Sequence, residues 1–272
     1  MPIEIQFLGQ VGCVITTPEC RVMVDPYLSN AVAETESEDL VRRVPIPPIS
    51  STATAVDAVF ITHNHLDHCD PETLHLIASL NENVPIFGPP SVINRLEKFP
   101  QNQNLNLKKL TRNFFLFGDI DVSILPSAHP IIRENAEGLW TTVGYLFNVA
   151  GRKIYHAGDT SLCQALIDHL KAHAPIDIGL IPVNECNFMR DASGILGNMS
   201  VREAFYLCDA VGIDRLIPTH WDMFDANCVY PEEISLLYRM ISPSFELSVI
   251  EAGQSIHLDT QKAGSQTCLS AS

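Results

Sequence analysis

The residues best suited to chemistry lie in one short stretch of the chain, residues 62–70, which reads Thr-His-Asn-His-Leu-Asp-His-Cys-Asp. Four side chains that bind metals fall within six positions: His63, His65, Asp67 and His68. Imidazole nitrogens and carboxylate oxygens suit divalent cations such as zinc, manganese and iron. The alternative is a polar loop that happens to be rich in histidine, and the H-x-H-x-D-H spacing argues against it.

The same stretch sits where a strand gives way to a helix. The apolar run 57–62 precedes it, and Asp70-Pro71 follows as a helix N-cap with a proline in the first turn. An irregular loop after a strand can turn His63 and His65 toward one cation and Asp67 and His68 toward its neighbour. The spacing therefore predicts a site for two adjacent metal ions.

The elements that position this loop can be predicted from hydrophobic periodicity. Ile3, Ile5 and Phe7 alternate with polar residues, and 11–17 and 21–25 predict a hairpin. Further strands are expected at 57–62, 84–88, 121–126, 144–149, 153–158, 176–183 and 214–219. Helices are expected at 71–80, 91–99, 161–173, 200–211 and 231–240. Consecutive strands come first in the chain, and strands that alternate with helices come later. This order predicts an α/β (α+β) fold of two stacked sheets with helices outside.

Residues 1–259 are expected to form a single domain, with a long surface loop at 31–55 and a flexible tail at 260–272. There is no apolar run of 20 residues and no signal peptide is visible, so we expect a cytoplasmic protein. The eight cysteines form no CxxC pair, which argues against a disulfide framework or a zinc finger. We expect Cys69 and Cys186 to be buried packing residues.

Charge narrows the range of partners. The 17 basic and 32 acidic side chains give a formal net charge of −15. Such a surface repels phosphate backbones, so nucleic acids and anionic membranes are not expected as partners. A small-molecule substrate, even an anionic one, remains compatible because bound cations reverse the local field.

The H-x-H-x-D-H run resembles the metallo-β-lactamase superfamily, and the family's other motifs follow in the same order. They are Asp25 in RVMVD, His129 in PSAHP, Asp159 in HAGDT and His220 in IPTHWDMF. The resemblance covers about residues 3–235 and implies an αββα four-layer sandwich with the site at one edge. It also implies that Asp25 supports the metal loop by contacting the ligand residues rather than the metal ions.

Carried over by position, the resemblance implies two divalent ions per chain, zinc or manganese, with iron less favoured. The first would take His63, His65 and His129, the second would take Asp67, His68 and His220, and Asp159 would bridge them. Water activated between the metals would attack the substrate. Asp67 would orient this water, and Asp67 and His220 are the two residues to which we assign a catalytic role.

Within the superfamily the chain is most similar to the L-ascorbate-6-phosphate lactonase branch. The similarity rests on residues 3–29, the AGDT segment, GNMSVREAFYLCDAVGIDRLIPTH and the following WDMF. It implies hydrolysis of a small-molecule ester, a lactone first of all. Oligomers are common in that branch, so a homo-oligomer is an open alternative to a monomer.

Several other readings stay open. A phosphodiesterase or phospholipase D-like hydrolase of the same fold is the main alternative. Diiron redox enzymes carry glutamate where this chain has His65, which disfavours redox chemistry, and one-iron persulfide oxidation and a non-catalytic metal-binding module are minor alternatives. Five further residues are candidates for substrate contact, and for each the alternative is a purely structural role: His156, Asn198, Trp221, Arg133 and Arg190.

Overall fold

The computed structural model describes residues 2–111 and 113–259, so the expected tail at 260–272 lies outside the described residues. Within them the strands form two seven-stranded sheets. In spatial order the first sheet holds β14 (Ser255–Leu258), β1 (Ile3–Gly9), β2 (Gly12–Thr16), β3 (Arg21–Val24), β4 (Ala58–Phe60), β5 (Pro85–Gly88) and β6 (Asn106–Lys109). The second holds β13 (Glu246–Leu247), β12 (Arg215–Thr219), β11 (Ile178–Pro182), β10 (Arg152–His156), β9 (Val143–Val149), β8 (Ile120–Pro126) and β7 (Phe114–Phe117).

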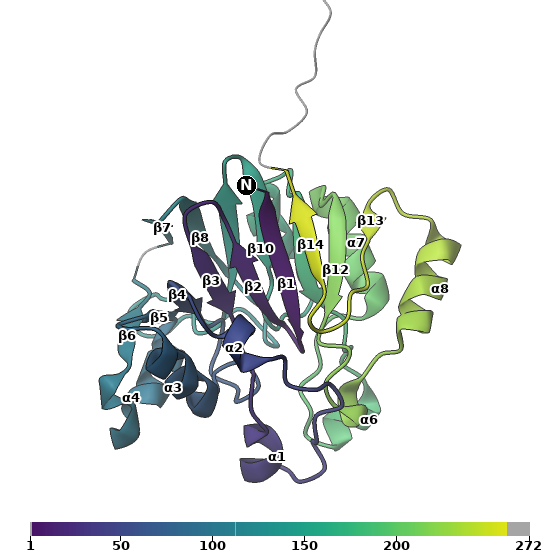
Figure 1. Ribbon diagram of the computed structural model, residues 1–272. Coiled ribbons are helices and arrows are strands. Elements are labelled where there is room, and N and C mark those ends of the chain that lie inside the picture. The colour runs from purple at the N-terminus through teal and green to yellow at the C-terminus, as the bar shows by residue number, and fades with distance from the viewer. Residues whose placement is uncertain (1, 112, 260–272) are drawn as a thin grey trace, which may run out of the picture.

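Helices cover the outer faces of both sheets (Figure 1). The longer helices are α3 (Pro71–Leu80), α4 (Pro90–Glu97), α5 (Gln164–Lys171), α7 (Val201–Val211) and α8 (Pro231–Ile241). Short helical turns are α1 (Ala31–Thr35), α2 (Ile49–Thr52), η1 (Pro100–Asn104), α6 (Phe188–Ala192) and η2 (Asp225–Asn227). No helix in the described part of the chain is both long and apolar enough to cross a bilayer.

Three apolar clusters define the layers. One lies between the sheets, where Ile3, Ile5 and Phe7 of β1 meet residues of β8, β9 and β10. A second cluster packs α5, α7 and α8 on the outer face of the second sheet, and a third packs α3 and α4 on the first. The predicted αββα sandwich of the α/β class is therefore confirmed.

Strand direction brings several loops to one edge of the sandwich. The predicted hairpin is present, since β2 and β3 are antiparallel with Cys13 opposite Val24. From β3 to β6 the first sheet is parallel, and from β10 to β13 the second sheet is parallel. Parallel neighbours end at the same edge, so the loops after β10, β11 and β12 lie together.

Two expectations need correction. The stretch 31–55 is not wholly a loop, because it contains the short helices α1 and α2. Cys186 is exposed rather than buried: it lies between β11 and α6 with its Sγ 3.3 Å from Asp191 Oδ1, whereas Cys69 is buried as expected. All the cysteines in the described residues are free thiols.

Candidate metal centre

The metal loop runs from the end of β4 to the start of α3. Asp70 caps α3 by accepting hydrogen bonds from the backbone N–H groups of Glu72 and Thr73, and Pro71 occupies the first turn. Inside the loop the N–H groups of His68 and Cys69 both donate to the carbonyl of His65. This tight turn, with the side chains of Leu66 and Cys69 buried beneath it, holds the histidines and Asp67 on one side.

The second sheet supplies the other three residues, each just beyond the carboxyl end of a strand. His129 follows β8, Asp159 follows β10 and His220 follows β12. His220 has a φ of 59°, a left-handed conformation that a residue with a side chain adopts only when its surroundings hold it. Here its N–H donates to the carbonyl of Gln10 at 2.5 Å.

The structure brings all seven residues together. Ligand atoms of His63, His65, His129 and Asp159 lie within 4.8 Å of one another, and so do those of Asp67, His68 and His220. Asp159 lies between the two sets: its Oδ1 is 3.3 Å from His68 Nε2, and its Oδ2 is 3.4 Å from His220 Nε2 and 3.7 Å from His129 Nε2. This is the position that a bridging carboxylate would need.

The donor set fits divalent cations. Three inward-facing atoms are buried and make no well-aligned hydrogen bond among the described residues: His63 Nε2, His68 Nε2 and Asp159 Oδ1, of which the last two lie 3.3 Å apart. Leaving one such buried polar atom unpaired costs about 1–3 kcal/mol. Cations between these nitrogens and oxygens would satisfy them, and histidine and carboxylate ligands suit zinc, manganese and iron.

Asp25, which follows β3, orients His68 directly and His63 through Thr62. Its Oδ2 accepts hydrogen bonds from His68 Nδ1 at 2.8 Å and from the Thr62 hydroxyl, and its Oδ1 accepts from the N–H of Thr62. The Thr62 hydroxyl lies 3.1 Å from His63 Nδ1 and can accept from it. With a cation bound, both Nδ1 atoms would carry the proton, and both Nε2 lone pairs would face the cluster.

Electrostatics differ across the cluster. Burial lowers the pKa of His63 well below its usual value and lowers the pKa of His129 to about 4, so both imidazoles are neutral near pH 7. Neutral imidazole is the form that binds a metal.

Three residues on the other side of the cluster form a charged group. Burial opposes the charged form of His220, but Asp159 and Asp67 outweigh it and raise its pKa to about 9. The pKa of His68 is raised by the same two carboxylates against the effect of burial. Burial would raise the pKa of Asp67, but His68 and His220 outweigh it and hold that pKa well below its usual range. Without a cation, these protons therefore balance the carboxylates.

One functional candidate was missed in the sequence. Gln10 lies in the turn between β1 and β2, and its Nε2 donates to Asp67 Oδ2 at 2.6 Å and lies 3.1 Å from His220 Nε2. Its backbone N–H donates to Asp222 Oδ1 at 2.8 Å. A single glutamine carries no recognisable pattern, and the only hint was its place in a Gly-Gln-Val-Gly turn between two apolar strands.

The weaker candidates lie in different surroundings. Both ring nitrogens of His156 are occupied, because Nε2 donates to the carbonyl of Val11 and Nδ1 accepts from the N–H of Gly158. Asn198 is buried and donates to Asn184 Oδ1, which ties two loops together. Arg190 donates to the carbonyls of Glu185 and Cys228, and Arg133 is exposed.

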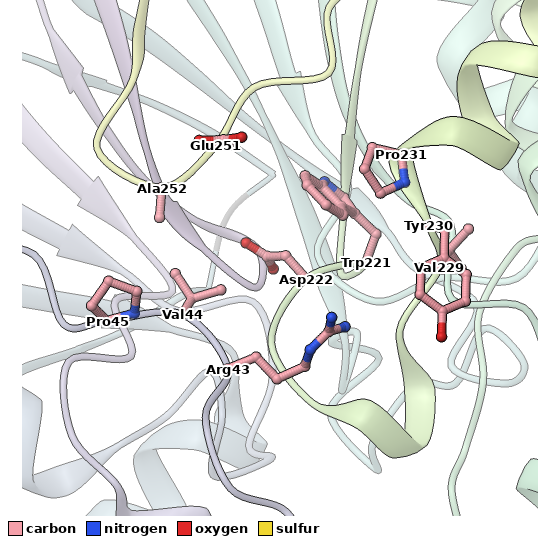
Figure 2. Close-up of a pocket in the computed structure, with 10 residues that line it drawn as sticks. All are labelled: Arg43, Val44, Pro45, Trp221, Asp222, Val229, Tyr230, Pro231, Glu251 and Ala252. Carbon is pink, nitrogen blue, oxygen red and sulfur yellow. The ribbon is translucent and has the colours of Figure 1, made fainter.

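Trp221 lines a pocket of about 380 Å³, which Figure 2 shows together with its other lining residues. Asp222 and Arg43 also line it, and Val44 and Tyr230 add apolar and aromatic surface. Burial raises the pKa of Asp222 to about 6. The volume is that of a small-molecule site. Trp221 and Asp222 directly follow His220, so the pocket and the cluster share one loop.

Comparisons with known proteins agree with this architecture. The chain is 26% identical over 237 residues to a UPF0173 metal-dependent hydrolase from Alkaliphilus metalliredigens, which covers 85% of this chain and 90% of that protein. Its fold is similar to that of Igni18, a metallo hydrolase from Ignicoccus hospitalis, with a TM-score of 0.70, 16% identity and coverage of 95% and 99% of the two chains. It is also similar to an isothiocyanate hydrolase from Delia radicum gut bacteria, with a TM-score of 0.74, 15% identity and coverage of 95% and 100%.

A family model bears on the identity of the chain more directly. The β-lactamase superfamily domain matches residues 20–221, a range that contains the metal loop, His129, Asp159 and His220. On this match, the chain belongs to the β-lactamase superfamily domain family.

Proposed function

We propose that this protein is a metal-dependent hydrolase that cleaves a small-molecule ester, with a lactone as the favoured substrate. The observation that carries the proposal is the convergence of seven histidine and aspartate side chains from four strand ends, with unpaired buried atoms facing one another. The names of the relatives from Alkaliphilus metalliredigens and Caldivirga maquilingensis, both metal-dependent hydrolases, support it.

Two groups of residues would hold the cations. His63, His65 and His129 would form one, Asp67, His68 and His220 the other, and Asp159 would serve both. Bound there, divalent cations would supply Lewis acidity and an activated water at neutral pH. The surrounding chain keeps the imidazoles in the required tautomer and excludes bulk water from His63, His68 and Asp159, which strengthens each electrostatic interaction.

The substrate would approach from the side of His65 and Asp67. His65 is exposed and the side chain of Asp67 is 17% exposed, whereas the other cluster side chains are buried. Asp67 remains ionised near pH 7, so its carboxylate accepts hydrogen bonds and can orient an attacking water. Gln10 holds one oxygen of this carboxylate in place at 2.6 Å.

The pocket beside Trp221 would hold the non-reacting part of the substrate. Its walls combine apolar surface with the charged groups of Arg43 and Asp222, as in sites that bind small polar molecules (Figure 2). The formal charge of −15 disfavours polyanionic substrates but leaves small ones possible. A lactone fits the resemblance to the lactonase branch, and a small phosphodiester is the competing class.

Purified protein supplied with zinc or manganese should be assayed on lactones, small phosphodiesters and thioesters. We expect lactone hydrolysis, and we expect Asp67→Asn to lower kcat by about 100-fold or more with little change in KM. Asp168→Asn, an exposed aspartate on α5, is the control and should keep full activity. Cleavage of phosphodiesters alone would support the competing class, and activity on no substrate would argue for a non-catalytic metal-binding module.

A further inference from the structure

We propose that Gln10 is part of the metal centre and that its side-chain oxygen faces the cation held by Asp67, His68 and His220. This inference rests on the proposed metal centre, but it concerns a residue type outside the histidine and aspartate pattern. It assigns the turn between β1 and β2 a role in binding the second metal ion.

The position of Gln10 is fixed by the hydrogen bonds of its backbone. Its φ is 58°, which costs a non-glycine residue about 1–2 kcal/mol and persists only where the surroundings impose it. The surroundings here come from the loop after β12: Asp222 Oδ1 accepts from the N–H of Gln10, and the carbonyl of Gln10 accepts from the N–H of His220. The turn is therefore clamped to the segment that carries the ligand His220.

The side chain of Gln10 is fully buried and its polar end faces the cluster. Nε2 lies 2.6 Å from Asp67 Oδ2 and 3.1 Å from His220 Nε2. Oε1 is buried and has no hydrogen-bond partner within the described chain. Leaving such a buried oxygen unpaired costs about 1–3 kcal/mol, and a cation beside it would remove this cost.

The described residues alone do not satisfy both ends of the amide. In the orientation seen here the N–H serves Asp67, and Oε1 has no partner. In the reversed orientation Oε1 would stand where Nε2 stands, 2.6 Å from a carboxylate oxygen, which places two acceptors against each other. A cation between Asp67 and His220 removes this repulsion and gives Oε1 a partner. Amide and carboxylate oxygens are ligands that manganese accepts well.

Metal binding provides a test that does not depend on catalysis. The wild-type chain should be titrated with Mn²⁺ by calorimetry, and its Co²⁺ complex should be recorded by visible absorption, which reports the ligands around cobalt. We expect Gln10→Ala to weaken one of the two binding steps by about 10- to 100-fold and to change the cobalt spectrum. Gln6→Ala is the control and should change neither, because Gln6 lies on β1 and its Nε2 donates to the carbonyl of Gly253.

Two further variants separate an oxygen ligand from a simple hydrogen-bond donor. Gln10→Glu keeps the oxygen but has no N–H, so it should bind the cation at least as tightly as the wild type if the oxygen faces the metal. Gln10→Asn tolerates the positive φ with a shorter side chain, so it preserves the turn while withdrawing the amide. It should weaken binding as the alanine variant does, even if that variant folds poorly.

The inference is overturned if the asparagine variant binds both metals as the wild type does with an unchanged cobalt spectrum. It is also overturned if the glutamate variant is weakened as much as the alanine variant, since that would identify Gln10 as a donor to Asp67 only. A wild-type chain that binds no divalent metal at all would instead refute the proposed metal-dependent function. The two failures are therefore distinguishable.

Discussion

Replacing Asp25 by asparagine should weaken metal binding although Asp25 is not among the seven ligands. Its carboxylate accepts three hydrogen bonds, from His68 Nδ1 and from the N–H and hydroxyl of Thr62. An asparagine has one acceptor oxygen, so its NH₂ group must face at least one of these donors. Losing the bond to a charged acceptor costs about 1.5–3 kcal/mol. At 1.36 kcal/mol per factor of ten, this corresponds to about 10- to 150-fold weaker binding.

Competition against a fluorescent chelator, with zinc and with manganese, measures this change. Asp177→Asn is a matched control: Asp177 is also a buried carboxylate, paired with Arg152 at 2.7 Å, but it lies before β11 at the opposite end of that strand from the metal centre. The control should lower the free energy of unfolding and leave metal affinity unchanged. If Asp25→Asn bound both metals within twofold of the wild type, the role of Asp25 in orienting His68 would be refuted.

Two more outcomes can be checked. The pKa values of His68 and His220 are raised in the metal-free chain, the latter to about 9, so metal binding at pH 7.5 should release protons and metal affinity should increase with pH up to about pH 9. Calorimetry in two buffers of different ionisation enthalpy measures the proton release, and binding without it would contradict the prediction. Gly158→Ala should lower the free energy of unfolding by about 2–4 kcal/mol in urea, because its φ is 59° and the added Cβ would lie 2.7 Å from the side chain of Thr62. Gly194→Ala, at a φ of 74° with open space around it, should cost only the backbone strain of about 1–2 kcal/mol, and equal losses in the two variants would show that the contact with Thr62 does not matter.

The central strands could be predicted because they are apolar over several residues and bounded by polar turns. The strands expected at 121–126, 144–149, 153–158 and 214–219 all have counterparts in β8, β9, β10 and β12. The strands that were not predicted are β6, β7, β13 and β14, which lie at the sheet edges, where burial is incomplete. β6 reads Asn-Leu-Lys-Lys, and β14 joins β1 from the far end of the chain.

The metal site was predictable to the extent that its residues are adjacent in sequence. His63, His65, Asp67 and His68 form a local pattern, whereas His129, Asp159 and His220 were expected only through the family resemblance. Gln10 had no such signal. Its contacts depend on a turn of one sheet meeting a loop of the other, and such distant contacts cannot be read from local spacing. The branch of the superfamily and the substrate stay predictions.

The ligands follow strands of both sheets, so a bound cation would also link the two sheets of the sandwich directly. It would close loops as long as that from His63 to His220, and restricting so much chain disfavours the unfolded state. A ligand that binds only the folded chain adds about 4 kcal/mol of stability when its concentration is 1,000 times its Kd. We therefore expect metal starvation to reduce heat resistance together with turnover, with the seam between the sheets at this edge opening before the helix-covered outer layers.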